Sequence, residues 1–173
     1  MVSTRILTRL SENGYNAVAI DLPGYGGTEA LKNEYPYHVI LEKIITSLSL
    51  DRPVIISPSF SGLYSIDYIL RNPKGLLAFI PVAPVFPENF ERVLENADVI
   101  ASLQSIPAFV VWGSKDTPGK DNSKRLLEIF TRGKSFAIEG ASHPCYLDEP
   151  ETFNEEVTSF LNNDVIIAGK NEL

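Results

Sequence analysis

A chain of 173 residues, 44% of them hydrophobic, is long enough to form one domain around an ordinary core. The formal net charge of −7, without a run of basic residues, argues against binding to nucleic acid or to an anionic membrane surface. One cysteine, Cys145, excludes an internal disulfide, and no apolar stretch approaches the roughly 18–20 residues of a membrane span.

The N-terminus lacks the apolar core of a signal peptide, and a single cysteine is compatible with a reducing compartment. Both features favour a cytoplasmic location, with the nucleus as a second possibility. Residues 170–173 read Lys-Asn-Glu-Leu and resemble the retrieval signal of the endoplasmic reticulum. That signal acts only on chains already in the lumen, so we interpret the match as chance.

The first part of the chain predicts two helices around one strand. Residues 6–14 have helical spacing that ends at Asn-Gly, and residues 16–21 form an apolar run typical of a strand covered on both faces. The glycine-rich turn at 21–28 lacks the lysine and the spacing of a phosphate loop. Residues 39–48 then predict an amphipathic helix, with His38 in front of it as a surface residue.

The remainder of the chain alternates apolar runs with helical patterns. Predicted strands lie at 53–56, 76–83, 108–113 and 134–139. Predicted helices lie at 63–72 and 126–133, and a last helix begins at Pro150. Residues 84–107 form an irregular excursion that is too short for a cap domain. This alternation predicts an α/β protein with a doubly wound, mostly parallel sheet.

The segment 53–62, Pro-Val-Ile-Ile-Ser-Pro-Ser-Phe-Ser-Gly, resembles a nucleophile elbow. Ser57 and Ser61 are small residues two positions on either side of Ser59, where the usual motif has glycines. Ser59 is therefore expected at a helix N-terminus, which favours developing negative charge, and the backbone N–H of Phe60 is a candidate oxyanion donor. An ordinary serine-rich loop between a strand and a helix remains the alternative.

Two later residues complete a candidate catalytic triad. Ser59, Asp116 and His143 each follow a predicted strand, at the sheet edge where open α/β sheets bind ligands, and in the order Ser, Asp, His. His143 would accept the serine proton, and Asp116 would fix its tautomer. Taken singly, Asp116 could form a turn and His143 could cap a loop. Their joint placement favours catalysis, whereas Cys145 is interpreted as a packing residue.

Three motifs carry a family resemblance. They are Asp-Leu-Pro-Gly-Tyr-Gly at 21–26, Ile-Ser-Pro-Ser-Phe-Ser-Gly at 56–62, and Gly-Ala-Ser-His-Pro-Cys-Tyr-Leu-Asp at 140–148. Together they resemble the α/β-hydrolase-domain protein 14 family, with similarity from about residue 15 to residue 161. The resemblance implies an α/β-hydrolase fold without a cap domain.

The resemblance also implies a function. Ser59, Asp116 and His143 would form the triad of a serine hydrolase that acts on small acyl esters. The family is further associated with removal of acetyl groups from protein lysines, with coenzyme A as acyl acceptor, and with a transcription-factor subunit as a protein partner. No metal ion or other cofactor is expected.

The sequence departs from the family pattern at its start. The family's first three strands, and the loop that supplies the second oxyanion donor, have no counterpart here. We therefore expect an N-terminally truncated member: one incomplete domain over residues 1–173, with a C-terminal tail at 162–173. Since loss of one oxyanion donor costs about 100- to 1,000-fold in turnover, the alternative function is a catalytically weak or inactive interaction protein.

Overall fold

Four parallel strands form one sheet in this computed structural model, which describes residues 4–165 apart from the side chain of Val93. The strand order is β1-β2-β3-β4, with bounds Val54–Pro58, Ala78–Val82, Ala108–Gly113 and Gly133–Ile138. Every residue of β2 and β3 is buried, as their near-continuous apolar sequences predict for central parallel strands. The predicted fold class is confirmed.

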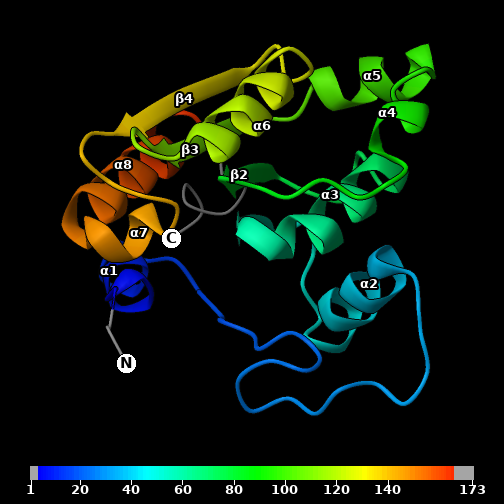
Figure 1. Cartoon of the computed structure of the whole chain (residues 1–173). Coiled ribbons are helices and arrows are strands. Elements are labelled where there is room, and N and C mark those ends of the chain that lie inside the picture. Colours follow the sequence, from blue (N-terminus) through cyan, green and yellow to red (C-terminus); the bar gives the residue numbers. More distant parts are fainter. Residues whose placement is uncertain (1–3, 166–173) are drawn as a thin grey trace.

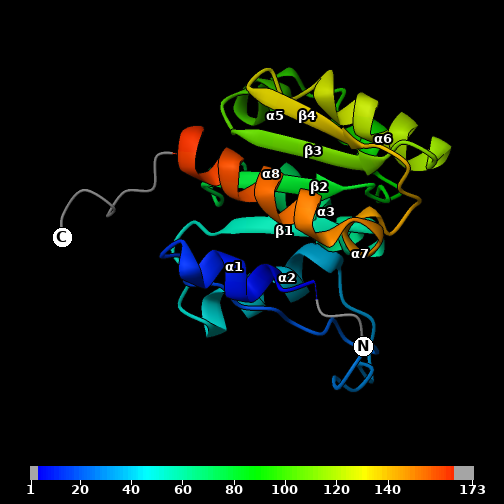
Figure 2. The same ribbon diagram turned by 90° about the vertical axis from the view of Figure 1, so that its left-hand side faces the viewer.

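Helices cover both faces of this sheet (Figures 1 and 2). On one face lie α2 (Tyr37–Ser47), α3 (Gly62–Arg71), α4 (Phe90–Val93), α5 (Ala97–Gln104) and α6 (Thr117–Leu127). On the other lie α1 (Ile6–Glu12), α7 (Cys145–Asp148) and α8 (Pro150–Asn163). Two separate apolar clusters result, one on each side of the strands.

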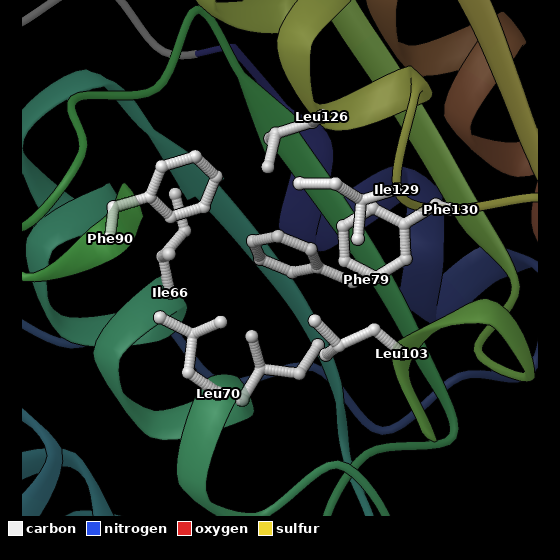
Figure 3. A pocket seen from close by; sticks show the side chains of 9 residues that line it. Ile66, Leu70, Phe79, Phe90, Leu103, Leu126, Ile129 and Phe130 are labelled. Carbon is white, nitrogen blue, oxygen red and sulfur yellow. The ribbon is translucent and has the colours of Figure 1, made fainter. Parts of the chain in front are cut away.

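The larger cluster has a small gap in its packing (Figure 3). A cavity of about 10 Å³ lies between β2 and helices α3 to α6, lined only by apolar side chains: Ile66, Ile69, Leu70, Phe79, Phe90, Leu103, Leu126, Ile129 and Phe130. That volume is at the lower limit for one water molecule, and nothing polar is present to bind one. The gap is a packing feature and not a ligand site.

The predicted strand at residues 16–21 is wrong. The segment joins no ladder, and the side chains of Val18 and Ile20 are 54% and 43% exposed. An apolar run becomes a strand only beside a partner, and β1, at the edge of the sheet, pairs only with β2 among the described residues. The glycine-rich turn that follows does form, since Asp21 Oδ2 accepts the Gly27 N–H at 2.9 Å.

Several predicted boundaries also need correction. The helix expected to end at Gly133 is α6, which begins earlier, where Asp116 caps it and a proline occupies its first turn, and already ends at Leu127. The loop expected at 140–146 contains the start of α7. Of the tail expected at 162–173, residues 162 and 163 belong to α8, Asp164 caps that helix and Val165 is buried. Residues 166–173, with the retrieval-like 170–173, lie outside the described residues.

His38 was expected at the surface before a helix, and this expectation is wrong. It lies within α2, with its side chain 19% exposed, and its Nδ1 lies 2.9 Å from Asp67 Oδ2 on α3. The His38 backbone N–H and Arg71 Nε also donate to this carboxylate, both at 3.1 Å. Burial alone would raise the pKa of Asp67, but these hydrogen bonds outweigh it and lower the pKa below its ordinary value. The cluster fastens α2 to α3.

Candidate active site

Ser59 occupies a strained turn between β1 and α3. Its φ of 48° lies in the left-handed region, which a residue with a side chain adopts only under constraint. The constraint comes from the loop after β2, because the Val85 N–H donates to the Ser59 carbonyl at 3.0 Å. Gly62 permits this approach, since a Cβ there would lie 2.5 Å from the Val85 carbonyl oxygen. The turn therefore has the geometry of a nucleophile elbow.

A chain of hydroxyl groups supports the elbow from below. Ser57, 1% exposed, has its Oγ 2.6 Å from Ser65 Oγ and 3.2 Å from Ser61 Oγ. Ser61 Oγ in turn donates to the Pro58 carbonyl at 2.5 Å. Sequence reasoning treated Ser57 and Ser61 only as small residues and missed Ser65. The helical spacing of Ser61 and Ser65 was the signal that could have revealed it.

The three candidate catalytic side chains meet at the carboxyl edge of the sheet. Ser59 Oγ lies 2.7 Å from His143 Nε2, and His143 Nδ1 lies 2.6 Å from Asp116 Oδ2. Ser59 follows β1, Asp116 follows β3 and His143 follows β4. Because the strands are parallel, these residues, distant in sequence, lie at one edge of the sheet. This is the connectivity that nucleophilic catalysis by a serine requires.

Asp116 and His143 differ in exposure. The Asp116 side chain is 6% exposed, and its second oxygen, Oδ1, accepts the Gly119 N–H at 3.1 Å as the N-cap of α6. The His143 side chain is 47% exposed. The carboxylate is therefore fixed and shielded, whereas the imidazole is half-exposed to solvent.

Phe60, the candidate oxyanion donor, begins a row of aromatic rings beside the elbow. Its backbone N–H lies in the first turn of the helical segment Ser59–Ser61, where no preceding helical carbonyl is available to accept it. Phe60 is 38% exposed, and its ring lies between the rings of Tyr25 and Tyr64, at 5.4 Å and 6.2 Å. The Tyr37 ring follows, 4.7 Å from Tyr64. Part of the surface beside Ser59 is thus aromatic.

Cys145, two residues from His143, has the packing role that the sequence indicated. It is fully buried, and burial raises the pKa of its thiol to about 11, so it carries no thiolate at neutral pH. No group of His, Cys, Asp and Glu side chains within residues 4–165 could hold a metal ion. In the same part of the chain, no helix has the length and apolarity to cross a membrane.

A hollow of about 230 Å³ lies at the opposite edge of the sheet. It is lined partly by Arg52, Lys74 and Arg132, near the amino ends of the strands. The three triad side chains are not part of its lining. Hydrogen-bond geometry, rather than cavity size, therefore identifies the candidate active site.

Comparison with known proteins decides the family. No protein-family model matches the chain. It is 36% identical over 160 residues to "Putative protein-lysine deacylase ABHD14B" of Homo sapiens, an alignment that covers 90% of this chain and 73% of the relative. The chain belongs to the ABHD14 family. Protein ABHD14A of Mus musculus is another relative, 31% identical, with 91% of this chain and 62% of the relative covered.

Solved structures support the fold of this ABHD14-family chain. A "predicted CIB-like hydrolase" from Thermoplasma acidophilum superposes with a TM-score of 0.77 at 24% identity, covering 92% of this chain and 78% of the other. The meta-cleavage product hydrolase CumD from Pseudomonas fluorescens gives 0.75 at 16% identity, covering 91% and 84%. At these identities the likeness establishes the α/β-hydrolase fold. The family resemblance inferred from the three motifs is confirmed.

Proposed function

We propose that this ABHD14-family chain is a serine hydrolase or acyl-transfer enzyme with Ser59 as nucleophile. The observation that carries the proposal is the unbroken hydrogen-bond chain from Ser59 Oγ through His143 to Asp116, with contacts of 2.7 and 2.6 Å. The left-handed backbone of Ser59 adds independent support, since strain of this kind concentrates at functional turns.

The contacts support one proposed role for each group. Asp116 accepts the Nδ1 proton of His143, which leaves the Nε2 lone pair directed at the Ser59 hydroxyl. As Ser59 Oγ attacks an acyl carbonyl, Nε2 takes its proton, and the buried carboxylate stabilises the imidazolium that forms. The Phe60 N–H would donate to the oxyanion of the tetrahedral intermediate.

Collapse of the tetrahedral intermediate completes the first half-reaction. His143 returns the proton to the leaving group, and the acyl group remains on Ser59 as an ester. A second nucleophile, deprotonated by the same imidazole, then attacks that ester and regenerates the serine. With water as nucleophile the reaction is hydrolysis, and with a thiol or an alcohol it is acyl transfer.

The proposed substrates are small acyl esters and acylated lysines. The name of the human relative describes a protein-lysine deacylase, and we extend that substrate class to this chain. The solvent-exposed imidazole favours a side chain presented on a protein surface, because such a substrate needs an open site. Coenzyme A as acyl acceptor is part of the same proposal and acts as a substrate, not as a resident cofactor.

The decisive test is covalent labelling of the folded protein by a fluorophosphonate, together with hydrolysis of p-nitrophenyl acetate. Ser59→Ala should abolish both signals. Ser57→Ala and Ser61→Ala should retain labelling at a reduced rate, since each loses a hydroxyl bond that supports the elbow. Ser102→Ala, an exposed hydroxyl on α5, is the matched control and should behave like the parent. Equal labelling of Ser59→Ala and parent would refute the proposal.

A catalytically weak interaction protein, with a transcription-factor subunit as one candidate partner, is the second possible function. It is favoured by the number of exposed large apolar side chains before or just after β1: Leu7, Val18, Ile20, Tyr25, Leu31, Tyr35, Tyr37, Leu48 and Phe60. Exposed apolar surface of this kind often marks a protein contact. A folded parent that the probe does not label would favour this function over the first.

A further inference from the structure

The loop that carries His143 is closed on itself by Asp148. The Asp148 Oδ2 atom accepts the backbone N–H of Ser142 at 2.7 Å and the Ser142 hydroxyl at 2.5 Å. The Asp148 N–H donates back to the Pro144 carbonyl at 3.1 Å. His143 therefore lies inside a ring of seven consecutive residues, 142–148, whose two ends are joined by one carboxylate.

The start of the same loop is fixed to the turn that carries Asp116. The Gly140 N–H donates to Ser114 Oγ at 2.8 Å, and the Lys115 N–H donates to the Ala141 carbonyl at 3.0 Å. Gly113 allows this approach, since a Cβ there would lie 2.5 Å from the Ala141 carbonyl oxygen. The backbone before His143 is thus tied to the turn after β3, and Asp148 joins that backbone to the residues after His143.

The contact between Asp148 and Ser142, here called the clamp, requires Asp148 to be ionised. The hydrogen bonds from Ser142 lower the pKa of Asp148, and the nearby Lys115 ammonium lowers it further, so the group is anionic at neutral pH. Its bonds go to Ser142, whereas Nδ1 of His143 is bonded to Asp116. Asp148 therefore acts on the backbone of the loop and not on the imidazole.

We propose that Asp148, acting through Ser142, is a positioning residue that holds His143 in line between Ser59 and Asp116. The inference rests on the proposed function. Its energetic logic is that a general base displaced by about 1 Å costs about 100-fold in rate. Asp148, the last residue of the 140–148 motif, would thus affect the reaction without contacting the substrate or the imidazole.

The test uses the complete chain with Asp148→Ala, which removes both acceptor oxygens, with Ser142→Ala, and with the double variant. We expect kcat for p-nitrophenyl acetate, and the fluorophosphonate labelling rate, to fall about 10- to 100-fold with KM unchanged. The double variant should be no worse than the more damaged single variant, because both remove one interaction. Ser142→Thr, which keeps the hydroxyl that Ser142→Ala removes, should retain most of the rate of the parent. Asp98→Ala, at an exposed acid on α5, is the control.

A purely structural role is separated by a spectroscopic readout. In the parent, the Nδ1 proton of His143 bonded to Asp116 should give a low-field proton resonance, and Asp148→Ala should shift or broaden it at temperatures well below melting. Full kcat with an unshifted resonance in folded Asp148→Ala would overturn the proposal, as would a rate loss that follows only the loss of thermal stability. A parent that is not labelled refutes the proposed function alone, because the resonance still tests the clamp.

Discussion

Replacement of Asp116 by asparagine should separate its two roles. One oxygen of the carboxylate contacts His143 Nδ1 at 2.6 Å, and the other caps α6 through the Gly119 N–H at 3.1 Å. An asparagine keeps an oxygen for the cap and places its amide N–H₂ against the imidazole. Nδ1 must then accept, so Nε2 carries the proton and can no longer take one from Ser59.

The magnitudes follow from this geometry. The same tautomeric change in a serine protease lowers turnover about 10,000-fold, or about 5 kcal/mol in activation free energy. We expect a loss between about 100- and 10,000-fold here, since the half-exposed His143 lets water compete for its nitrogens. Stability should change little, because asparagine and aspartate are equally good N-caps, whereas Asp116→Ala should also lose about 1 kcal/mol.

The assay pairs steady-state hydrolysis of p-nitrophenyl acetate with thermal denaturation of the same samples. Asp116→Asn should melt with the parent and be nearly inactive, whereas Asp116→Ala should be inactive and less stable. An Asp116→Asn variant that is stable and fully active would show that the acid of the triad lies elsewhere. The reasoning from the Asp116–His143 contact would then fail.

Three further outcomes are expected. The pKa of Asp67 in the folded protein lies below its unfolded value of about 3.9. The ionised carboxylate therefore stabilises the fold fully above about pH 3.9, and this stabilisation is lost as the pH falls through the folded-state pKa. Between about pH 5 and pH 3, the Tm of the parent should fall more than the Tm of Asp67→Asn. Leu103→Ala should cost about 2–5 kcal/mol in chemical denaturation because it enlarges an existing cavity (Figure 3), whereas Leu48→Ala, at a 42% exposed side chain, should cost less than about 0.5 kcal/mol. Exposed Val18 and Ile20 should promote self-association, so Val18→Lys with Ile20→Lys should reduce the light scattering of concentrated samples, and unchanged scattering would contradict this.

The sheet and the three candidate catalytic positions could be predicted because their signals are local. The β-branched run before Ser59 and the apolar run of β3 need no distant information to indicate buried strands. Once parallel pairing is assumed, the residues that follow Val54–Pro58, Ala108–Gly113 and Gly133–Ile138 must share one edge. The contacts between Ser59, Asp116 and His143 are then a consequence of topology.

Other features could not be predicted because they depend on tertiary partners. Residues 16–21 have the composition of a strand, but a strand exists only as part of a ladder, and composition does not reveal whether a neighbour is present. His38 was predicted to be exposed because no residue near it in sequence indicates that the carboxylate of Asp67, on another helix, is its partner. Asp148 likewise lay in a recognised motif, but only the fold shows that its partner is Ser142.

The strand order has a mechanical consequence for Ser59 and His143. Ser59 follows one outer strand of the sheet and His143 follows the other, so their 2.7 Å contact spans three successive strand ladders. A small shear in any ladder adds to this distance, whereas the shorter path from Asp116 to His143 crosses only one ladder. If β1 frays from β2, Ser59, the proposed nucleophile, separates from His143 while the β3–β4 half remains native. The reactivity of Ser59 therefore depends on intact pairing of all four strands. On heating, it should decline at a lower temperature than the one at which the fluorescence of Trp112 on β3 changes with unfolding.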